Sequence, residues 1–188
     1  MNRRSTFSRR IFASVGVAAA ATLAMPALRA QPRLEKSKLA LAVGGKAAFY
    51  YLPLTISDQL GFFKAEGLDI EISDFAGGAR ALQAVVGGSA DVVSGAYEHT
   101  INLQSKNQMF QAFVLQGRAP QIAFGVSVKN MPNYKTIADL RGKKIGVSAP
   151  GSSTNMMANL VLSRGGVKSG DVSFIGVGTA AGALTALR

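Results

Sequence analysis

The sequence predicts an α/β fold made of two similar lobes, and three observations support this prediction. From residue 38 onward, short β-rich runs alternate with segments of helical period, which is typical of parallel strands linked by crossover helices. A faint internal repeat relates the two halves at an offset of 102 residues. Loops of small residues stand directly before several predicted helices, at the edge where open α/β sheets bind ligands.

The first predicted lobe alternates strands with helices. Its expected strands are 39–43, the run through Ile70 and Ile72, 91–94 and 109–115, and its expected helices are 53–64, 79–86 and 98–106. Helix 53–64 would carry Leu54, Leu60 and Phe63 on its apolar side. A further apolar run, 122–128, leads out of this lobe.

The second predicted lobe repeats this order on a smaller scale. We expect a short helix at 137–140, a strand at 144–147, a helix at 153–164, a strand at 172–175 and a final helix from residue 180. Aligning Leu82 with Leu184 pairs the strand residues of the two lobes as well, Ile70 with Val172 and Ile72 with Phe174. The strand that begins at Asp91 would map beyond residue 188. We therefore expect the chain to be the front part of a longer protein with an incomplete second lobe.

The first thirty residues have the pattern of an export signal. The stretch SRRIF, residues 8–12, has paired arginines followed by phenylalanine, and a mostly apolar run continues to residue 24, as in a twin-arginine signal peptide. A membrane anchor is the alternative, but about a dozen apolar residues are short of the roughly 20 that span a bilayer. We expect cleavage after Ala30, passage through the twin-arginine translocase and a soluble periplasmic protein.

Composition narrows the classes of function. The net charge is +11, but the first thirty residues hold five of the 21 basic residues and no acidic residue. A tight basic patch at Arg141, Lys143 and Lys144 has no interleaved aromatic residues, so a solvated edge is favoured over nucleic-acid contact. The chain has no cysteine and one histidine. This excludes disulfides, a thiolate metal site and a lipidated cysteine, and we predict no metal and no cofactor.

The stretch GVSAPGSST, residues 146–154, resembles a phosphate-binding loop at first sight. Its glycines occupy both glycine positions of G-x-x-x-x-G-K-[ST], but Ser152 replaces the lysine, which argues against a nucleotide hydrolase. Two interpretations stay open. Ser152 or Ser153 could simply cap the next helix, or the loop could cap the helix and also contact a ligand.

A serine hydrolase is the enzyme alternative, and the sequence argues against it. Pro150 stands where the G-x-S-x-G elbow needs its second glycine. The single histidine, His99, lies near the start of a predicted helix, where packing or capping is more common than a role as general base. We therefore predict no catalytic residues.

Aromatic residues lie at two predicted strand-to-helix junctions of the first lobe. Phe49, Tyr50 and Tyr51 form one group, and Tyr97 beside Glu98 forms the other. Core packing and the walls of a binding site for a small polar or heterocyclic ligand are both consistent with this pattern.

Four stretches resemble a known family. They are AFYYLPLTISDQLGFFKAEGLDIEI, GGARALQAVVGGSADVVSGAYEHTI, LRGKKIGVSAPGSSTNMMANLVLSRGGV and VGTAAGALTALR. Their order is similar to that in the nitrate/sulfonate/taurine/thiamine-precursor group of ABC-transporter substrate-binding proteins. The resemblance covers essentially all of residues 38–188 and does not specify the ligand.

The resemblance implies a type 2 periplasmic binding fold, in which two α/β lobes close on a ligand in a cleft. Residues 1–30 would be the signal peptide, 31–120 the first lobe, and 121–188 the hinge crossing with an incomplete second lobe. The implied function is a non-catalytic receptor that delivers a small molecule, such as a sulfonate, an oxyanion or a pyrimidine, to an ABC permease in the inner membrane. An enzyme on the same fold, such as a pyrimidine-precursor synthase, and an exported sensor are the alternatives.

The resemblance also implies ligand contacts on five loops. The expected contact residues of the first lobe are Gly45, Phe49, Tyr50, Gly77, Gly78, Ala79, Ser94 and Tyr97. Those of the second lobe are Gly151, Ser152, Ser153, Thr154, Gly178 and Thr179. We expect no nucleic acid among the partners.

Overall fold

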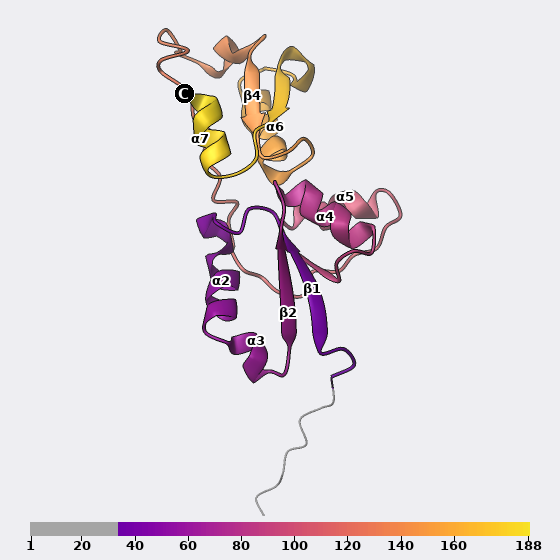
Figure 1. Ribbon diagram of the computed structural model, residues 1–188. Coiled ribbons are helices and arrows are strands. Elements are labelled where there is room, and N and C mark those ends of the chain that lie inside the picture. Colours follow the sequence, from indigo (N-terminus) through magenta and orange to yellow (C-terminus); the bar gives the residue numbers. More distant parts are fainter. Residues whose placement is uncertain (1–33) are drawn as a thin grey trace, which may run out of the picture. The chain divides into compact units, whose positions relative to one another are not determined.

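The computed structural model describes residues 34–188 of the chain (Figure 1). The predicted export signal, its cleavage site and the start of the predicted first lobe lie outside these residues. The chain divides into two units, Met1–Glu35 and Lys36–Arg188, and the elements below belong to the second. No helix among residues 34–188 has the length and apolarity needed to cross a membrane.

The first lobe has a three-stranded parallel sheet in the order β2-β1-β3. Its strands are β1 Lys38–Val43, β2 Asp69–Asp74 and β3 Val92–Ser94. Its helices are η1 Phe49–Tyr51, α2 Leu52–Gln59, α3 Phe62–Ala65, α4 Gly78–Val86 and α5 Glu98–Gln104. Helices follow each strand, as a parallel sheet with crossover connections requires, so the predicted fold class is confirmed.

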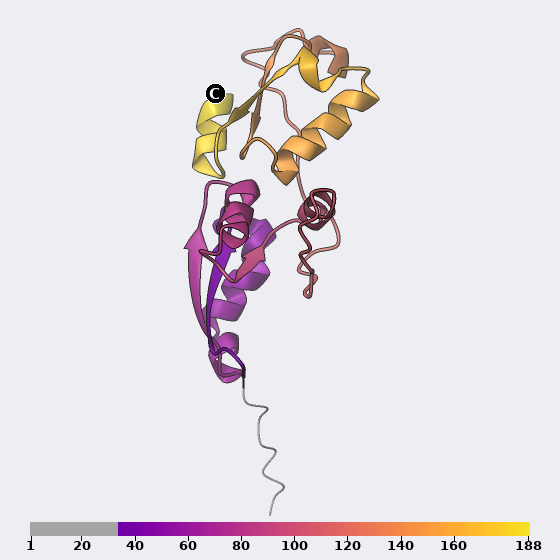
Figure 2. The same cartoon turned by 90° about the vertical axis from the view of Figure 1, so that its right-hand side faces the viewer.

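The two faces of β1 build the core of this lobe. Leu41 and Val43 pack with Tyr51 and Leu54 on one face, while Ala42 packs with α4 on the other, because successive strand residues point to opposite faces. Helices α2 and α3 lie along one side of the sheet and α4 along the other (Figures 1 and 2). Burial of strand β1 on both faces fixes where its carboxyl end, and the loop after it, must lie.

The predicted helix 53–64 is interrupted, and this part of the prediction is wrong. Gly61 has a φ of +73°, in the left-handed region that favours glycine and ends helices. Helix α2 therefore stops at Gln59 and α3 restarts at Phe62. Leu60, expected on the apolar side, is 65% exposed at the break.

The second lobe has a two-stranded parallel sheet, β4 Lys144–Val147 and β5 Ser173–Gly176. The elements around it are η2 Ile137–Leu140, α6 Ser153–Arg164, η3 Ser169–Asp171 and α7 Ala181–Leu187. Its core holds Ile145 and Val147 from β4 and Ala158 and Leu162 from α6. Strand β4 thus points its carboxyl end at the loop that begins α6.

The internal repeat has a structural counterpart. Leu41 of β1 pairs with Ile72 of β2, and Ile145 of β4 pairs with Phe174 of β5. Ile72 and Phe174 are the residues that the repeat aligns. In each lobe, the repeated strand is the parallel neighbour of the strand that opens the lobe.

The predicted strand 109–115 does not form, and 122–128 contains no strand either. Within the described part of the chain, no backbone-to-backbone hydrogen bond involves residues 109–126. Met109, Phe113 and Leu115 are 79%, 76% and 73% exposed. A β-rich segment becomes a strand only when a neighbouring strand pairs with it, and no described strand lies beside this one.

Candidate functional site

The loops that follow β1 and β2 meet at the carboxyl edge of the first sheet. A Cβ atom on Gly44 would overlap the backbone of Gly77 and Gly78, so only glycine permits this approach. The Asp74 carboxylate at the end of β2 accepts hydrogen bonds from the backbone N–H of Gly45 at 2.7 Å and of Lys46 at 2.9 Å. The loop after β1 is therefore held in place, and the Gly45 N–H is already used.

The N-terminus of α4 lies at the same edge. Gly77 precedes the helix with a φ of +115°, and both Gly77 and Gly78 are buried. Among the described residues, the N–H groups of Gly78 and Ala79 have no hydrogen-bond partner, because the first N–H groups of a helix have none within it. Two donors at the positive end of the helix dipole thus have no partner among the described residues, although Gly44 packs against the nitrogen of Gly78.

The predicted aromatic walls divide into packed and free groups. Tyr51 is 7% exposed in the core, and Tyr50 meets it edge-to-face with ring centroids 4.9 Å apart. Phe49 and Tyr97 are 87% and 67% exposed. Packing therefore accounts for Tyr51, while the rings of Phe49 and Tyr97 are open to contact with another molecule.

Two carboxylates influence these phenols. Burial, with the charges of Tyr50, Asp74 and Glu98, raises the pKa of Tyr51 to about 12. Burial and the charge of Glu98 also raise the pKa of Tyr50. Burial lowers the pKa of His99, against a smaller opposite effect of Glu98. The carboxyl edge of the first lobe thus has phenols, carboxylates and a neutral imidazole close together.

Ser94, at the end of β3, is 8% exposed. Its hydroxyl donates a hydrogen bond to Gln116 Oε1 at 2.9 Å. This bond ties β3 to the segment that leaves the lobe, so the predicted contact residue Ser94 faces protein in this structure.

The loop 146–154 of the second lobe contains a closed cluster of three hydroxyls. Ser152 is fully buried, and its Oγ lies 2.9 Å from Ser148 Oγ and 2.7 Å from Thr154 Oγ1. Thr154 Oγ1 also accepts the backbone N–H of Ser148 at 2.9 Å. These bonds hold the loop closed from within, and Ser148 was not predicted to take part in them.

The capping interpretation of this loop is wrong. Ser152 occupies the N-cap position of α6 without a side-chain capping bond, and the hydroxyl of Ser153 has no partner among residues 34–188. The first bond of the helix runs from Met156 N–H to the Ser152 carbonyl at 3.0 Å. Among the described residues, the N–H groups of Ser153, Thr154 and Asn155 have no hydrogen-bond partner, whereas that of Gly151 is bonded to Asn155 Oδ1 at 2.9 Å.

Two close approaches join the loops of the two lobes within the unit 36–188. A Cβ atom on Gly77 would lie 3.1 Å from Ser148 Oγ, and one on Gly45 would lie 2.7 Å from the Thr179 side chain. Gly178 donates its N–H to the Ser148 carbonyl at 3.1 Å. The structure therefore brings the predicted residues Gly45, Gly77 and Thr179 together.

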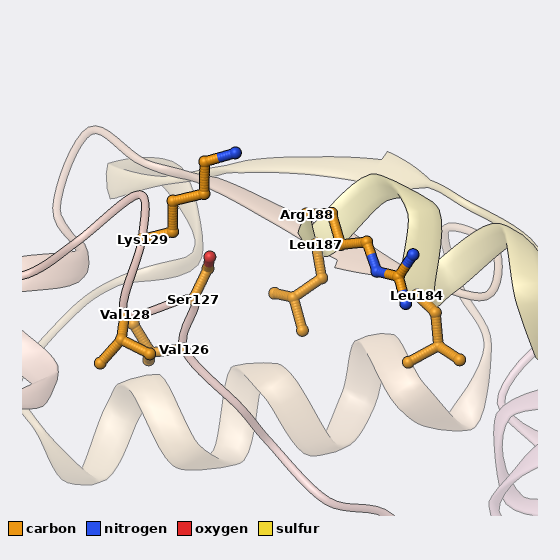
Figure 3. A pocket seen from close by; sticks show the side chains of 7 residues that line it. All are labelled: Val126, Ser127, Val128, Lys129, Leu184, Leu187 and Arg188. Carbon is orange, nitrogen blue, oxygen red and sulfur yellow. The ribbon is translucent and has the colours of Figure 1, made fainter.

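Two hollows lie away from these residues. A hollow of about 470 Å³ is lined by Val126–Lys129 on the segment before η2, by Leu184 and Leu187 on α7, and by Arg188 directly after it (Figure 3). A second, of about 300 Å³, is lined by Lys64 and Gly67–Asp69. Neither contains a predicted contact residue.

Parallel sheets with glycine-rich loops and helix N-termini at their carboxyl edges define an α/β binding-protein fold of the periplasmic type. The chain belongs to the NMT1/THI5-like family, whose model matches residues 48–186.

Known proteins agree with this assignment. A solved structure from Bordetella bronchiseptica RB50 is 67% identical, with a TM-score of 0.81, and the match covers 83% of this chain and 49% of that one. A protein of Brucella abortus (strain 2308), provisionally named a binding protein, is 30% identical over 137 residues, which are 71% of this chain and 40% of the relative.

A more distant structure shares the fold. The alkanesulfonate-binding protein SsuA from Xanthomonas axonopodis pv. citri, bound to MOPS, is 20% identical with a TM-score of 0.55. The match covers 81% of this chain and 51% of that protein. The chain thus spans about half the length of the solved structures that it matches, and 40% of the curated relatives.

Proposed function

We propose that this protein is a non-catalytic receptor that captures a small molecule outside the cytoplasm for an ABC importer. The observation that carries the proposal is the approach of Gly77 to Ser148. It brings the start of α4 in one lobe close to the loop that begins α6 in the other, and a ligand bound there would reach the N-termini of both helices. Such a region suits an oxyanion or a carbonyl group.

Binding would work by closure of the lobes. A ligand that contacts both helix N-termini is held more tightly when the lobes are close together, and it shifts the population toward the closed state by that difference in affinity. The closed form would then dock on the permease. The glycines at positions 45 and 77 favour this mechanism because a side chain at either would meet the opposite lobe.

The remaining parts of the proposal rest on the sequence. Residues 1–30 would direct export through the twin-arginine translocase to the periplasm, 31–120 would form the first lobe, and 121–188 the hinge crossing and part of the second. Family membership and the binding-protein names of relatives support a receptor. Sulfonates, other oxyanions and pyrimidines are the ligand classes to examine.

Thermal-shift measurements test the proposal. The protein, and a chimera in which the second half of the Bordetella protein follows residue 188, are heated with ethanesulfonate, taurine, nitrate or an aminopyrimidine. A receptor is stabilised by its ligand, by about 2.7 kcal/mol at one hundred times the dissociation constant. Failure of every compound to raise the melting temperature of both proteins, or turnover of a compound, would contradict the receptor function.

A further inference from the structure

The charged residues of the second lobe are unevenly distributed along its sequence. Residues 145–163 and 172–187, which include the loop 146–154, most of α6 and all of α7, contain no charged residue. Residues 135–171 contain six basic residues and two acidic ones. The basic residues are Lys135, Arg141, Lys143, Lys144, Arg164 and Lys168. Since residues 34–120 contain seven basic and eight acidic residues, the excess positive charge of the described chain belongs to the second lobe.

The fold brings these basic residues to the amino edge of the β4–β5 sheet. The two strands run parallel, and the Gly142 N–H donates a hydrogen bond to the Asp171 carbonyl at 2.7 Å directly before both strands. Helix α6 ends at the same edge, since a Cβ atom on Gly165 would overlap the Ile137 side chain of η2. Figure 2 shows the end of α6 and the chain that enters β5 at this end of the lobe. The loop 146–154 follows the carboxyl end of β4 and therefore lies at the opposite end of the sheet.

Most of the cations at this amino edge are not neutralised by an acidic side chain. Arg141 Nε lies 3.9 Å from Asp171 Oδ2, the one ion pair found at the edge among residues 34–188. Lys143, Lys144 and Lys168 are exposed and form no ion pair with the described residues. The edge therefore presents at least three unpaired ammonium groups to the solvent.

The amino edge combines these cations with an inward-facing set of apolar side chains. Leu140, Ile145 and Val167 pack in the core of the lobe, and no large apolar side chain of residues 132–145 or 164–174 is exposed. Protein interfaces are enriched in aromatic residues and depleted in lysine, and sites for single-stranded nucleic acid stack bases on aromatic rings. A lysine-rich surface without aromatic residues is better matched to a layer of lipid phosphate groups.

We propose that the amino edge of the second-lobe sheet binds the headgroups of anionic phospholipids and holds the protein on a membrane surface. Lysine is a point charge on a flexible stem, so it contacts a plane of phosphates without a fixed geometry. With this edge on the bilayer, the loop 146–154 at the other end of the sheet stays clear of lipid. The inference goes beyond the receptor function, and it would keep such a receptor near a transporter embedded in the same membrane.

Vesicle sedimentation measures this binding on the full chain, with equal parts of phosphatidylglycerol and phosphatidylcholine compared with phosphatidylcholine alone. The edge variant carries Lys143→Gln, Lys144→Gln and Lys168→Gln. The control variant changes three exposed lysines of the first lobe that form no ion pair with described residues, by Lys38→Gln, Lys64→Gln and Lys106→Gln. Each lysine near an anionic bilayer changes affinity about fivefold, so we expect the edge variant to bind the anionic vesicles about a hundredfold more weakly. The control should lose less than about tenfold, because distant charges are screened.

A fluorescent label shows which part of the chain contacts the bilayer. The sequence has no cysteine, so Ser169→Cys on η3 and Ser105→Cys directly after α5 each provide a single thiol, and both serines are exposed. A lipid with a quencher on its headgroup should quench the label at residue 169 and not the label at residue 105. This measurement separates the edge from the arginines of residues 1–30, which all variants share. Circular dichroism checks that every variant folds.

Four results would overturn the inference. They are absence of binding to anionic vesicles, equally tight binding to phosphatidylcholine alone, equal affinities of the edge and control variants, and stronger quenching at residue 105 than at residue 169. Poly-glutamate that binds the wild-type protein as tightly as the anionic vesicles do would assign the edge to an acidic protein instead of a membrane. None of these measurements uses the captured ligand, so each failure would leave the proposed receptor function intact.

Discussion

Ser152→Ala should destabilise the protein, and the size of the loss follows from its hydroxyl contacts. The Oγ is fully buried and bonds Ser148 Oγ at 2.9 Å and Thr154 Oγ1 at 2.7 Å. Each such bond contributes about 0.5–1.5 kcal/mol net, so we expect the free energy of unfolding to fall by about 1–3 kcal/mol.

The neighbouring substitution, Ser153→Ala, should behave differently. The Ser153 hydroxyl is half-buried and has no hydrogen-bond partner among the described residues. Its loss should change the free energy of unfolding by less than about 0.5 kcal/mol. If Ser153 contacts the ligand, its removal should weaken binding while stability is retained.

Urea unfolding followed by circular dichroism measures both variants, and calorimetry measures their affinity for the ligand. Thr154→Ser is the control, because it keeps the Oγ that accepts the Ser148 N–H at 2.9 Å. An equal loss of stability in Ser152→Ala and Ser153→Ala would refute the reasoning. A large loss in Ser153→Ala alone would restore the capping interpretation.

Three further measurements probe other parts of the structure. Burial lowers the pKa of His99 in the folded state, so on acidification the unfolded state binds a proton before the folded state does. The free energy of unfolding should therefore fall as the pH drops below about 6.5. A His99→Gln variant that retains the full decrease would contradict this. Gly165→Ala places a Cβ against the side chain of Ile137 and should cost about 1–3 kcal/mol, measured by urea unfolding, with Gly170→Ala as a control at an open position. In a spectrophotometric titration, Tyr51 should ionise near pH 12, and a Tyr51→Phe variant should lose the ionisation step at the highest pH. Loss of an ionisation step at lower pH instead would contradict the burial of the Tyr51 phenol.

Elements with strong local signals could be predicted from the sequence. Helix α6 begins and ends at the predicted residues, and β4 occupies its predicted range, because an apolar strand followed by small residues and a helical pattern is recognisable locally. The helix break at Gly61 could not be predicted from the local sequence. A glycine inside an amphipathic pattern is compatible with a continuous helix, and only its φ of +73° shows the interruption.

The candidate site was predictable as a set of loops but not as a set of contacts. Glycines before helices predicted that the loop with Gly77 lies at the site edge, and the structure adds its approach to Ser148 of the second lobe. The direction of a hydroxyl, however, depends on neighbours that the local sequence does not specify. Ser152 turns inward to Ser148, and Asp74 accepts the N–H of Gly45, a predicted contact residue. The only sequence signal for this second contact was the carboxylate at the end of β2.

The segment 109–126 shows why a β-rich pattern alone does not make a strand. β-branched and aromatic residues favour a pleated, half-buried position. The backbone hydrogen bonds of a strand, however, must come from a neighbouring segment. Here Phe113 and Leu115 are 76% and 73% exposed. The backbone of residues 109–126 makes no hydrogen bond to the backbone of any described residue. A contiguous patch of exposed apolar side chains is typical of a surface that contacts another molecule or another segment. The predicted strand therefore does not form here because no described segment pairs with it.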